Sequence, residues 1–343
     1  MQHPLLYLGL IGFEPEEELR VRHWLEINAQ QASETVSQDQ SRYPIWRVVD
    51  FQEADALLIC GAGVQQGGPH SLQFKASARK PSSPIGLQLD ELKLPYALSH
   101  LPQLQAMGVR TEHVPEFDAR QDASLLKTIQ YFETALRPLR SLFALALELT
   151  QRQNELDGDH TFHLERNGSL QVIVDAPARR VLLHPGVRPV DIGADAWMRR
   201  PRSANFAPAH FLQCSLEEIT WLFGMHCPLV DLPERYAQKT IHLRRNPRVR
   251  SSLLYPRHAT LLDRLSLAPP TLAQLRQDLP THQPWLERDL FALYLTRAIS
   301  TATAPDGQTQ SLNTRDFDTT GKWTLDRLSR RANTVAGDLN PLF

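Results

Sequence analysis

The residues best suited to chemistry in this 343-residue chain are arginines that gather in its last third. Five of them lie within fourteen positions: Arg244, Arg245, Arg248, Arg250 and Arg257. A guanidinium group donates several hydrogen bonds in a fixed planar fork, which fits the oxygen atoms of phosphates and carboxylates. The spacing therefore predicts a surface that binds an anion or an anionic partner. It does not combine an acid, a base and a nucleophile, so we expect no enzyme.

The arginine cluster leaves three classes of partner open. A protein partner is the preferred hypothesis, and DNA is the alternative because the basic stretch precedes three predicted helices. A cyclic dinucleotide is a further alternative. Arg244 and Arg248 have an RxxxR spacing, which resembles the first half of the cyclic-di-GMP motif of PilZ domains. The second half of that motif, a D/N-x-S-x-x-G run, does not follow.

The last of the three predicted helices, Pro284–Ser300, separates the protein hypothesis from the DNA hypothesis. Recognition helices usually present Arg, Asn, Gln or Ser to the groove. This segment is instead rich in Leu, Phe and Tyr, as a core helix would be. Arg288 and Arg297 facing outward would favour DNA, whereas an outward face of Leu, Phe and Tyr would favour a protein partner.

Other clusters of polar residues predict neither a metal nor a cofactor. The first set is His210, Cys214, His226 and Cys227. It lacks a CxxC knuckle, and its adjacent His and Cys would point to different sides of a helix. The second set is Asp157, Asp159, His160 and His163, which reads as solvated turn residues. The glycine-rich stretch 61–68 matches neither the P-loop nor the dinucleotide fingerprint and is expected to be a loop.

Charge distribution and cysteine content limit the kinds of protein that this chain can be. Lys and Arg total 37 against 38 Asp and Glu, yet residues 1–60 hold ten acids and four arginines, while residues 239–300 hold ten bases and four acids. Three cysteines, at 60, 214 and 227, do not make a disulfide framework and favour a reducing compartment. No apolar run is long enough to span a membrane. We therefore expect a cytoplasmic protein without membrane contact.

Hydrophobic patterning predicts an α/β head that begins with buried parallel strands. The expected strands are Leu5–Phe13, Ile45–Val49, Ala56–Gly61, Pro84–Leu89 and Val109–Val114. The first is a continuous apolar run bounded by prolines, which is typical of a strand covered on both faces. A helical stretch, 123–156, follows with an amphipathic face. We expect Pro138 to kink or split it, its start to pack on the sheet, and its remainder to connect domains or form a homodimer seam.

The head, residues 1–120, resembles the receiver domain of response regulators in its pattern of strands and helices. In that family an acidic pair after the first strand holds magnesium, an aspartate after the third strand accepts phosphate, and a lysine ends the fifth strand. The matching positions here are Gly12, Phe13, Cys60, Gly61 and Pro115. A hard cation needs clustered oxygen ligands, and phosphotransfer needs a nucleophile. The resemblance therefore implies a pseudo-receiver that has kept the flavodoxin-like parallel sheet.

Beyond the head, the pattern predicts a mixed middle and a helical end. Asn167-Gly168 between alternating segments predicts a β-hairpin, residues 185–208 read as irregular, and Ser215 caps a predicted helix. The basic stretch and the three helices after it resemble winged-helix modules that follow receiver-like domains in bacterial signalling proteins. The predicted parts are 1–121, 122–156, 157–239, 240–300 and a loose tail, 301–343, with one short helix.

These observations predict a non-enzymatic bacterial signalling adaptor that acts by protein–protein interaction without phosphotransfer. A transcription regulator that binds DNA through residues 240–300 is the alternative. A cyclic dinucleotide effector that uses the arginine cluster is the further alternative.

Overall fold

A computed structural model describes residues 3–34, 45–68, 70–74, 85–152, 160–193, 197–206 and 208–301. The chain divides into two compact units, residues 3–137 and the chain from Pro138 onward. This division falls inside the predicted connecting stretch 123–156. The tail and its expected short helix lie outside the described residues, apart from Thr301.

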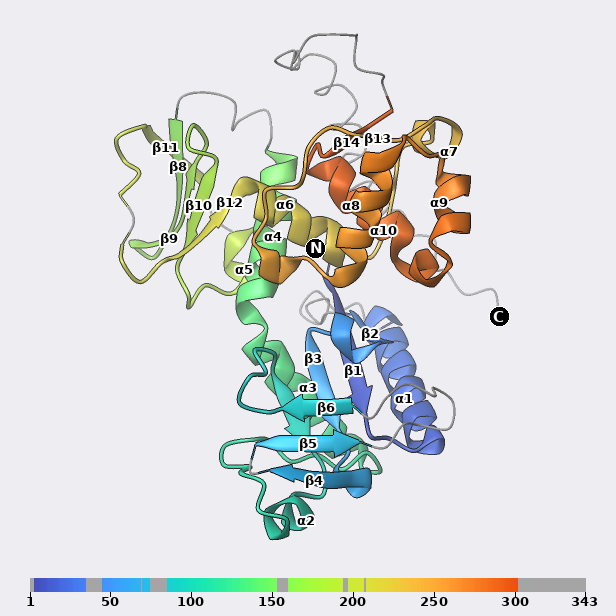
Figure 1. The fold of residues 1–343 in the computed structure, drawn as a ribbon. Helices are drawn as coiled ribbons and strands as arrows, with labels where there is room; N and C mark the ends of the chain where they lie inside the picture. The colour runs from blue at the N-terminus through green and yellow to red at the C-terminus, as the bar shows by residue number, and fades with distance from the viewer. Residues whose placement is uncertain are drawn as a thin grey trace. The chain divides into compact units, whose positions relative to one another are not determined.

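The first unit is built on a parallel sheet with the strand order β2-β1-β3-β7 (Figure 1). Its strands are β1 (Leu5–Ile11), β2 (Ile45–Val49), β3 (Ala56–Ile59) and β7 (Tyr96–Leu98). Residue Leu8 in β1 pairs with Val48 on one side and Ala56 on the other. Nearly all of β1 and all of β3 are buried. The three strands predicted first are thus confirmed, and for β1 and β3 the continuous apolar run is covered on both faces, as expected.

The fourth predicted strand, Pro84–Leu89, is present but lies in another sheet, and the fifth, Val109–Val114, is wrong. Residues Ile85–Gln88 form β6, which does not join the parallel sheet. It pairs with β5 (Ser71–Phe74) in a separate antiparallel sheet, whose other edge is β4 (Val64–Gly68). Strand β4 also replaces the loop expected in the glycine-rich stretch. Residues 109–114 form a turn instead of a strand, because His113 has a positive φ of 69° that a β-strand does not allow.

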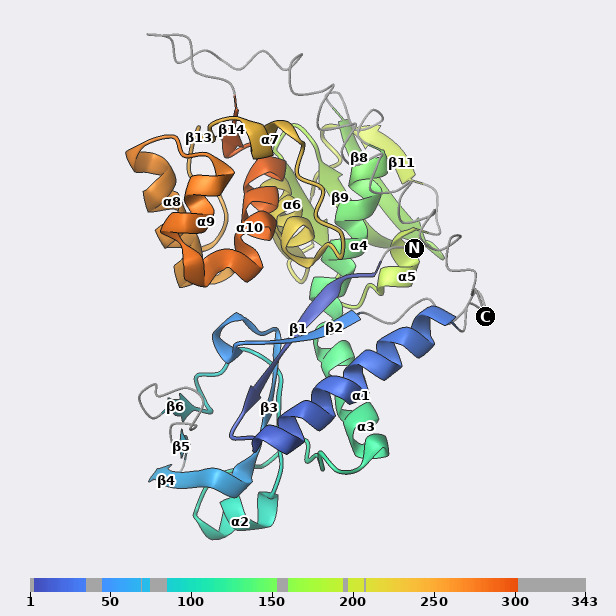
Figure 2. The same ribbon diagram turned by 90° about the vertical axis from the view of Figure 1, so that its right-hand side faces the viewer.

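Helices flank the parallel sheet (Figure 2). They are α1 (Pro15–Glu34), α2 (Leu101–Ala106) and α3 (Asp122–Ala135). In α3, Phe132 is fully buried, its ring centroid lies 6.2 Å from that of Trp46 in β2, and the indole Nε1 of Trp46 donates to Glu133 at 3.5 Å. The start of the predicted helical stretch therefore packs on the sheet, as expected. The helix ends at Ala135, and the next helix has Pro138 in its first turn.

The second unit contains a five-stranded antiparallel sheet with the order β11-β8-β9-β10-β12. Its strands are β8 (His160–Arg166), β9 (Ser169–Asp175), β10 (Arg180–Leu183), β11 (Trp197–Pro201) and β12 (Leu212–Ser215). The predicted hairpin at Asn167-Gly168 is confirmed, and both residues have the positive φ that a tight two-residue turn needs. The expectation that residues 185–208 are irregular is wrong in part, since they include β11 and the short helix α5 (Pro189–Ile192).

Helices pack beside this sheet in the second unit. They are α4 (Arg137–Gln151), α6 (Leu216–His226), α7 (Arg235–Gln238), α8 (Pro256–Leu267), α9 (Leu272–Asp278) and α10 (Gln283–Leu295). Helix α6 lies between the sheet and helices α8 to α10 in both views (Figures 1 and 2). Two short strands, β13 (His242–Leu243) and β14 (Ile299–Ser300), pair antiparallel on either side of the three-helix segment.

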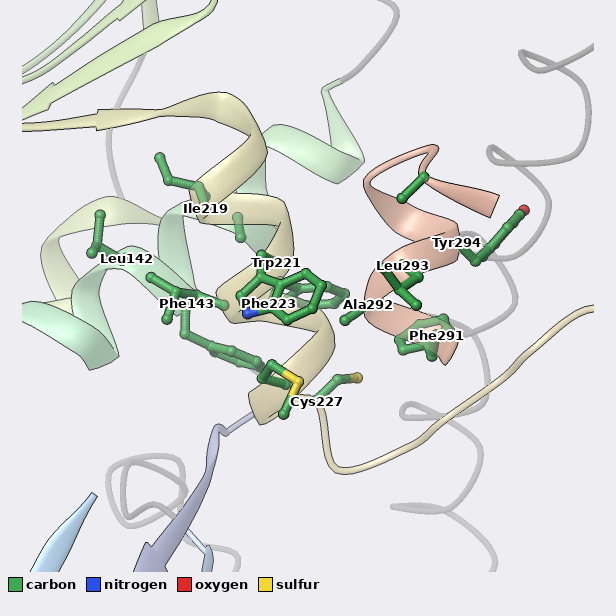
Figure 3. Packing of buried hydrophobic residues seen from close by; sticks show 14 of the residues in the cluster. Leu142, Phe143, Ile219, Trp221, Phe223, Cys227, Phe291, Ala292, Leu293 and Tyr294 are labelled. Carbon is green, nitrogen blue, oxygen red and sulfur yellow. The ribbon is translucent and has the colours of Figure 1, made fainter. Parts of the chain in front are cut away.

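The packing of α6 against α4 and α10 forms the centre of the larger core (Figure 3). Helix α6 presents Trp221 and Phe223 here, and the Phe223 ring stacks on Phe143 of α4 with centroids 5.2 Å apart. On its other side α6 touches α10 closely. A Cβ atom at Gly224 would lie 2.8 Å from the Cα of Ala292, so only glycine permits this approach.

A buried ion pair joins α8 to α10. Arg257 Nε lies 3.0 Å from Asp289 Oδ2, and both side chains are almost fully buried. His258 Nε2 lies 3.0 Å from the other carboxylate oxygen, while His258 Nδ1 accepts a hydrogen bond from the Tyr255 backbone. Since Nδ1 accepts, Nε2 carries the proton and donates to Asp289. The Arg257 guanidinium also lies over the ring of Trp285, 4.4 Å from its centroid.

Removing the acid of this pair should destabilise the second unit. We expect Asp289→Ala to lower the free energy of unfolding by about 3–5 kcal/mol, because it leaves the Arg257 charge buried without a counter-ion. Glu287→Ala, two residues earlier on the same helix, breaks a pair with Arg276 that is about half exposed and should cost less than ~1 kcal/mol. Urea unfolding measures both variants, and equal losses would contradict this account.

Candidate functional site

The predicted receiver-site residues meet at one edge of the parallel sheet in the first unit. The Cys60 backbone N–H donates to Ile11 at 2.8 Å, and the Leu98 N–H donates to Pro115 at 3.1 Å. Gly12 has a φ of +76°, and a Cβ atom there would lie 2.6 Å from the Cys60 carbonyl oxygen. The carboxyl ends of parallel strands share an edge, so the sequence placed Gly12 and Cys60 correctly, directly after β1 and β3. Pro115 does not follow a strand as expected; it lies in the loop between α2 and α3 and reaches this edge through its hydrogen bond with Leu98 of β7.

Close packing fills this edge. The backbone N–H of Gly61 donates to the Ser99 hydroxyl at 3.2 Å, and a Cβ atom at Gly61 would lie 2.5 Å from the Ser99 carbonyl oxygen. The ring of Phe13 stacks on that of Phe117, with centroids 5.9 Å apart. Glycine, thiol and aromatic groups thus occupy the positions where a receiver needs carboxylates.

A small pocket of about 260 Å³ opens beside this edge. Its carboxylates are Glu17, Glu116 and Asp118, and they come from α1 and from the loop between α2 and α3 rather than from strand ends. Glu17 pairs with Arg120 at 3.5 Å, and its other oxygen lies 3.9 Å from the Cys60 sulfur. Within the described parts of the chain, no group of three or more His, Cys, Asp or Glu residues is arranged to hold a metal ion.

The arginine-rich segment 244–250 in the second unit runs along the first turn of α6. Glu217 and Glu218 face it there. Arg245 Nη1 lies 2.6 Å from Glu217 Oε1, which also accepts the backbone N–H of Arg248 at 2.7 Å. Arg250 Nε lies 2.7 Å from Glu218 Oε1. The two acids, which the sequence places in the first turn of a capped helix, are therefore also the partners of the cluster.

Part of this segment lines a pocket of the second unit with a volume of about 540 Å³. Its walls come from the turn between β9 and β10, from the end of β12 with the first turn of α6, and from segment 248–250. The lining residues are Ala178, Arg179, Arg180, Gln213, Cys214, Ser215, Glu218, Arg248, Val249 and Arg250. We call this cavity the arginine pocket.

Of the four guanidinium groups of the arginine pocket, two have a carboxylate partner and two do not. Arg180 is held by Asp175 at 3.1 Å, and Arg250 is held by Glu218. The side chains of Arg179 and Arg248 are exposed and have no hydrogen-bond or ion-pair partner among the described residues. Four positive charges therefore face one lining carboxylate, and two of the forks are available to a ligand.

Cys214 is the thiol of the arginine pocket. Burial raises its pKa, and the neighbouring Arg250, whose Nη2 lies 3.8 Å from the sulfur, opposes that rise only in part. The group is therefore a protonated thiol at neutral pH and a poor nucleophile. The pocket can attract and orient an anion, but it offers no activated group to react with one.

The other predicted site arginines lie outside the arginine pocket. Arg244 reaches Ser300 at 3.5 Å beside strands β13 and β14, and Arg257 is buried against Asp289. The RxxxR pair, Arg244 and Arg248, does not line one cavity. Conversely, sequence reasoning missed Arg179 and Arg180. The only signal in the sequence was that these two arginines are adjacent.

The described residues of α10 show neither of the two outward faces expected from the sequence, arginines for DNA or Leu, Phe and Tyr for a protein partner. Arg288 is buried, and its Nη1 donates to the backbone carbonyls of Met225 at 3.0 Å and Cys227 at 2.5 Å. Phe291 and Tyr294 are buried within the same unit. Helix α10 is thus a core helix, and its surface presents neither an arginine row nor an apolar face.

Neither family models, nor curated proteins, nor solved structures gave a match to this chain. The helices of the described chain are each too short or too polar to cross a bilayer. We therefore infer the kind of site from its geometry alone. The arginine pocket is a cationic pocket without a reactive group.

The arginines of segment 244–250 should divide experimentally into structural and free ones. Arg245→Ala removes the pair with Glu217 and a 2.8 Å hydrogen bond to the Thr296 carbonyl, and it leaves a nearly buried carboxylate. We expect a loss of about 1–3 kcal/mol in the free energy of unfolding. Arg248→Ala keeps the backbone hydrogen bond to Glu217 and should change it by less than ~0.5 kcal/mol. Chemical denaturation compares them, and an equal loss would show that the Arg248 side chain is also structural.

Proposed function

We propose that the chain is a non-enzymatic signalling adaptor of receiver-like ancestry, which acts by binding partners and not by phosphotransfer. One observation carries the proposal, namely the packed edge of the parallel sheet. A side chain at Gly12 would collide with the Cys60 carbonyl oxygen and with the ring of Phe74, 2.7 Å away. An acidic ligand for a cation therefore has no room at this position.

The phosphoacceptor position supports the same proposal. Cys60 is almost fully buried and follows β3, where a receiver would expose an aspartate. A thiol this deeply buried behaves as a small hydrophobic group, even though its sulfur lies 3.9 Å from a Glu17 carboxylate oxygen. The carboxylates of the neighbouring pocket belong to other elements, and Glu17 among them pairs with Arg120. Phosphotransfer needs an exposed nucleophile beside a bound cation, and these residue types do not combine the two.

The DNA alternative draws less support from the second unit. A recognition helix must expose the side chains that contact base edges. In α10 most of the middle positions are buried, and the Arg288 side chain donates hydrogen bonds to backbone carbonyls of α6 and of the residue after it. Several of the arginines near α6 are paired with carboxylates, which lowers the charge available to phosphates of a duplex.

Phosphotransfer is tested by incubating the full chain with acetyl phosphate and magnesium. We expect no phosphate on the protein by intact-mass spectrometry, because no exposed carboxylate lies where the phosphoacceptor would be. An active receiver domain under the same conditions is the positive control. Stoichiometric, acid-stable and base-labile labelling of residues 3–137 would overturn the proposal.

A salt titration separates the adaptor from the DNA-binding alternative. We expect no saturable binding of a fluorescent random duplex in anisotropy measurements, even at low ionic strength, since the helix that would enter the groove is buried. Affinity that falls linearly with the logarithm of salt concentration would instead favour a DNA-binding protein.

A further inference from the structure

We propose that the arginine pocket of the second unit is a binding site for a phosphoryl group, held mainly by Arg179 and Arg248. The inference rests on the proposed adaptor function for its biological setting, because it specifies the chemistry of one partner. Its physical basis lies wholly in the second unit, and it does not depend on the fate of the receiver-like site.

The walls of the pocket are set by backbone hydrogen bonds. Strand β10 pairs with β12, so Arg180 lies opposite Ser215 and Val181 opposite Cys214. The carbonyl of Arg179 accepts the N–H of Leu216 at 3.0 Å, which fixes the turn against the start of α6. On the facing wall, the Arg250 backbone N–H donates to Glu218 at 3.2 Å. These hydrogen bonds fix the backbone of the walls without a ligand, so binding has to order mainly the side chains of Arg179 and Arg248.

The charges in the pocket favour a dianion. Asp175 and Glu218 hold Arg180 and Arg250 and satisfy part of their donors. Arg179 and Arg248 have no such partner among the residues described, so two further full positive charges line the same pocket. A phosphoryl group carries about −1.5 to −2 at neutral pH and three acceptor oxygens, and can accept from two guanidinium forks at once. A single carboxylate carries one charge and matches one fork.

The lining argues against a nucleobase as the main contact. Ala178 and Val249 are the apolar side chains that line the pocket, and none of its lining residues is aromatic. Bases bound outside a duplex usually stack on aromatic rings. The phosphoryl group is therefore the feature recognised. It could belong to a phosphorylated side chain of a partner protein or to a small phosphomonoester, and the experiment distinguishes these two sources.

The test is a binding titration on the full chain with three probes. They are inorganic phosphate, phenyl phosphate and a fluorescent peptide that contains one phosphoserine. The same peptide with serine, and again with glutamate, serves as the comparison. We expect the phosphopeptide to bind at least tenfold more tightly than either comparison peptide, and inorganic phosphate to displace it. Similar affinities for phenyl phosphate and the phosphopeptide would assign the site to small phosphates, and a much tighter phosphopeptide would assign it to a protein partner.

A charge-matched pair of double variants locates the site. Arg179→Ala/Arg248→Ala removes the two unpaired arginines and should weaken phosphate and phosphopeptide binding at least tenfold, since each guanidinium would donate charge-assisted hydrogen bonds to the phosphoryl oxygens. Arg199→Ala/Arg276→Ala removes the same charge from exposed positions on β11 and α9 and should change affinity less than about twofold. Urea midpoints verify that both variants fold.

Three outcomes would overturn the inference. They are the absence of binding by all phosphoryl probes, equal affinity for the glutamate peptide, and equal weakening by the two double variants. None of these outcomes bears on acetyl phosphate labelling, which tests the adaptor proposal at the other unit. Labelling of the receiver-like unit, in turn, would leave the arginine pocket untouched.

Discussion

The second unit depends on two nearly buried carboxylates at the start of α6. Glu217 and Glu218 occupy the first turn, where the helix dipole favours negative charge, and Glu218 also completes the capping box with Ser215. A carboxylate that leaves water needs charged or hydrogen-bonding partners. Arg245 and Arg250 provide them, together with backbone N–H groups of the same segment. Segment 244–250 is thereby fixed beside the end of β12, and one wall of the arginine pocket is built.

This constraint explains why neighbouring arginines have different roles. The guanidinium groups of Arg245, Arg250 and Arg257 form ion pairs within the fold and contribute to its stability. The backbone of Arg248 is tied to Glu217, so its side chain is positioned by a bond that leaves the guanidinium free. Arg179 is similar, because its carbonyl anchors the turn while its side chain is exposed. At both positions backbone hydrogen bonds fix the chain, and the guanidinium group remains available to a ligand.

Sequence patterns predicted the strands that are continuously buried. They failed where the pairing of strands determines which sheet a segment joins. The strands β1, β2 and β3 follow from their apolar runs. In contrast, Ile85, Leu87 and Leu89 alternate with Gly86 and Gln88, which is the period of a half-buried antiparallel strand. Weighing that alternation would have removed β6 from the parallel sheet. The pairing of β10 with β12 brings residues 179 and 180 near 248 and 250, and nothing in their sequence separation reveals it.

The two proposals assign opposite chemistry to the two units. A receiver uses carboxylates to hold a cation, and the cation and an aspartate then bind and accept the phosphoryl group. In the first unit, Gly12 and Cys60 close that edge by backbone contact. In the second, guanidinium groups would contact the phosphoryl oxygens directly. The nearest candidate nucleophile there is Cys214, whose buried thiol is protonated at neutral pH. Such a pocket can recognise a phosphoryl group and release it intact, which is what an adaptor requires and an enzyme does not.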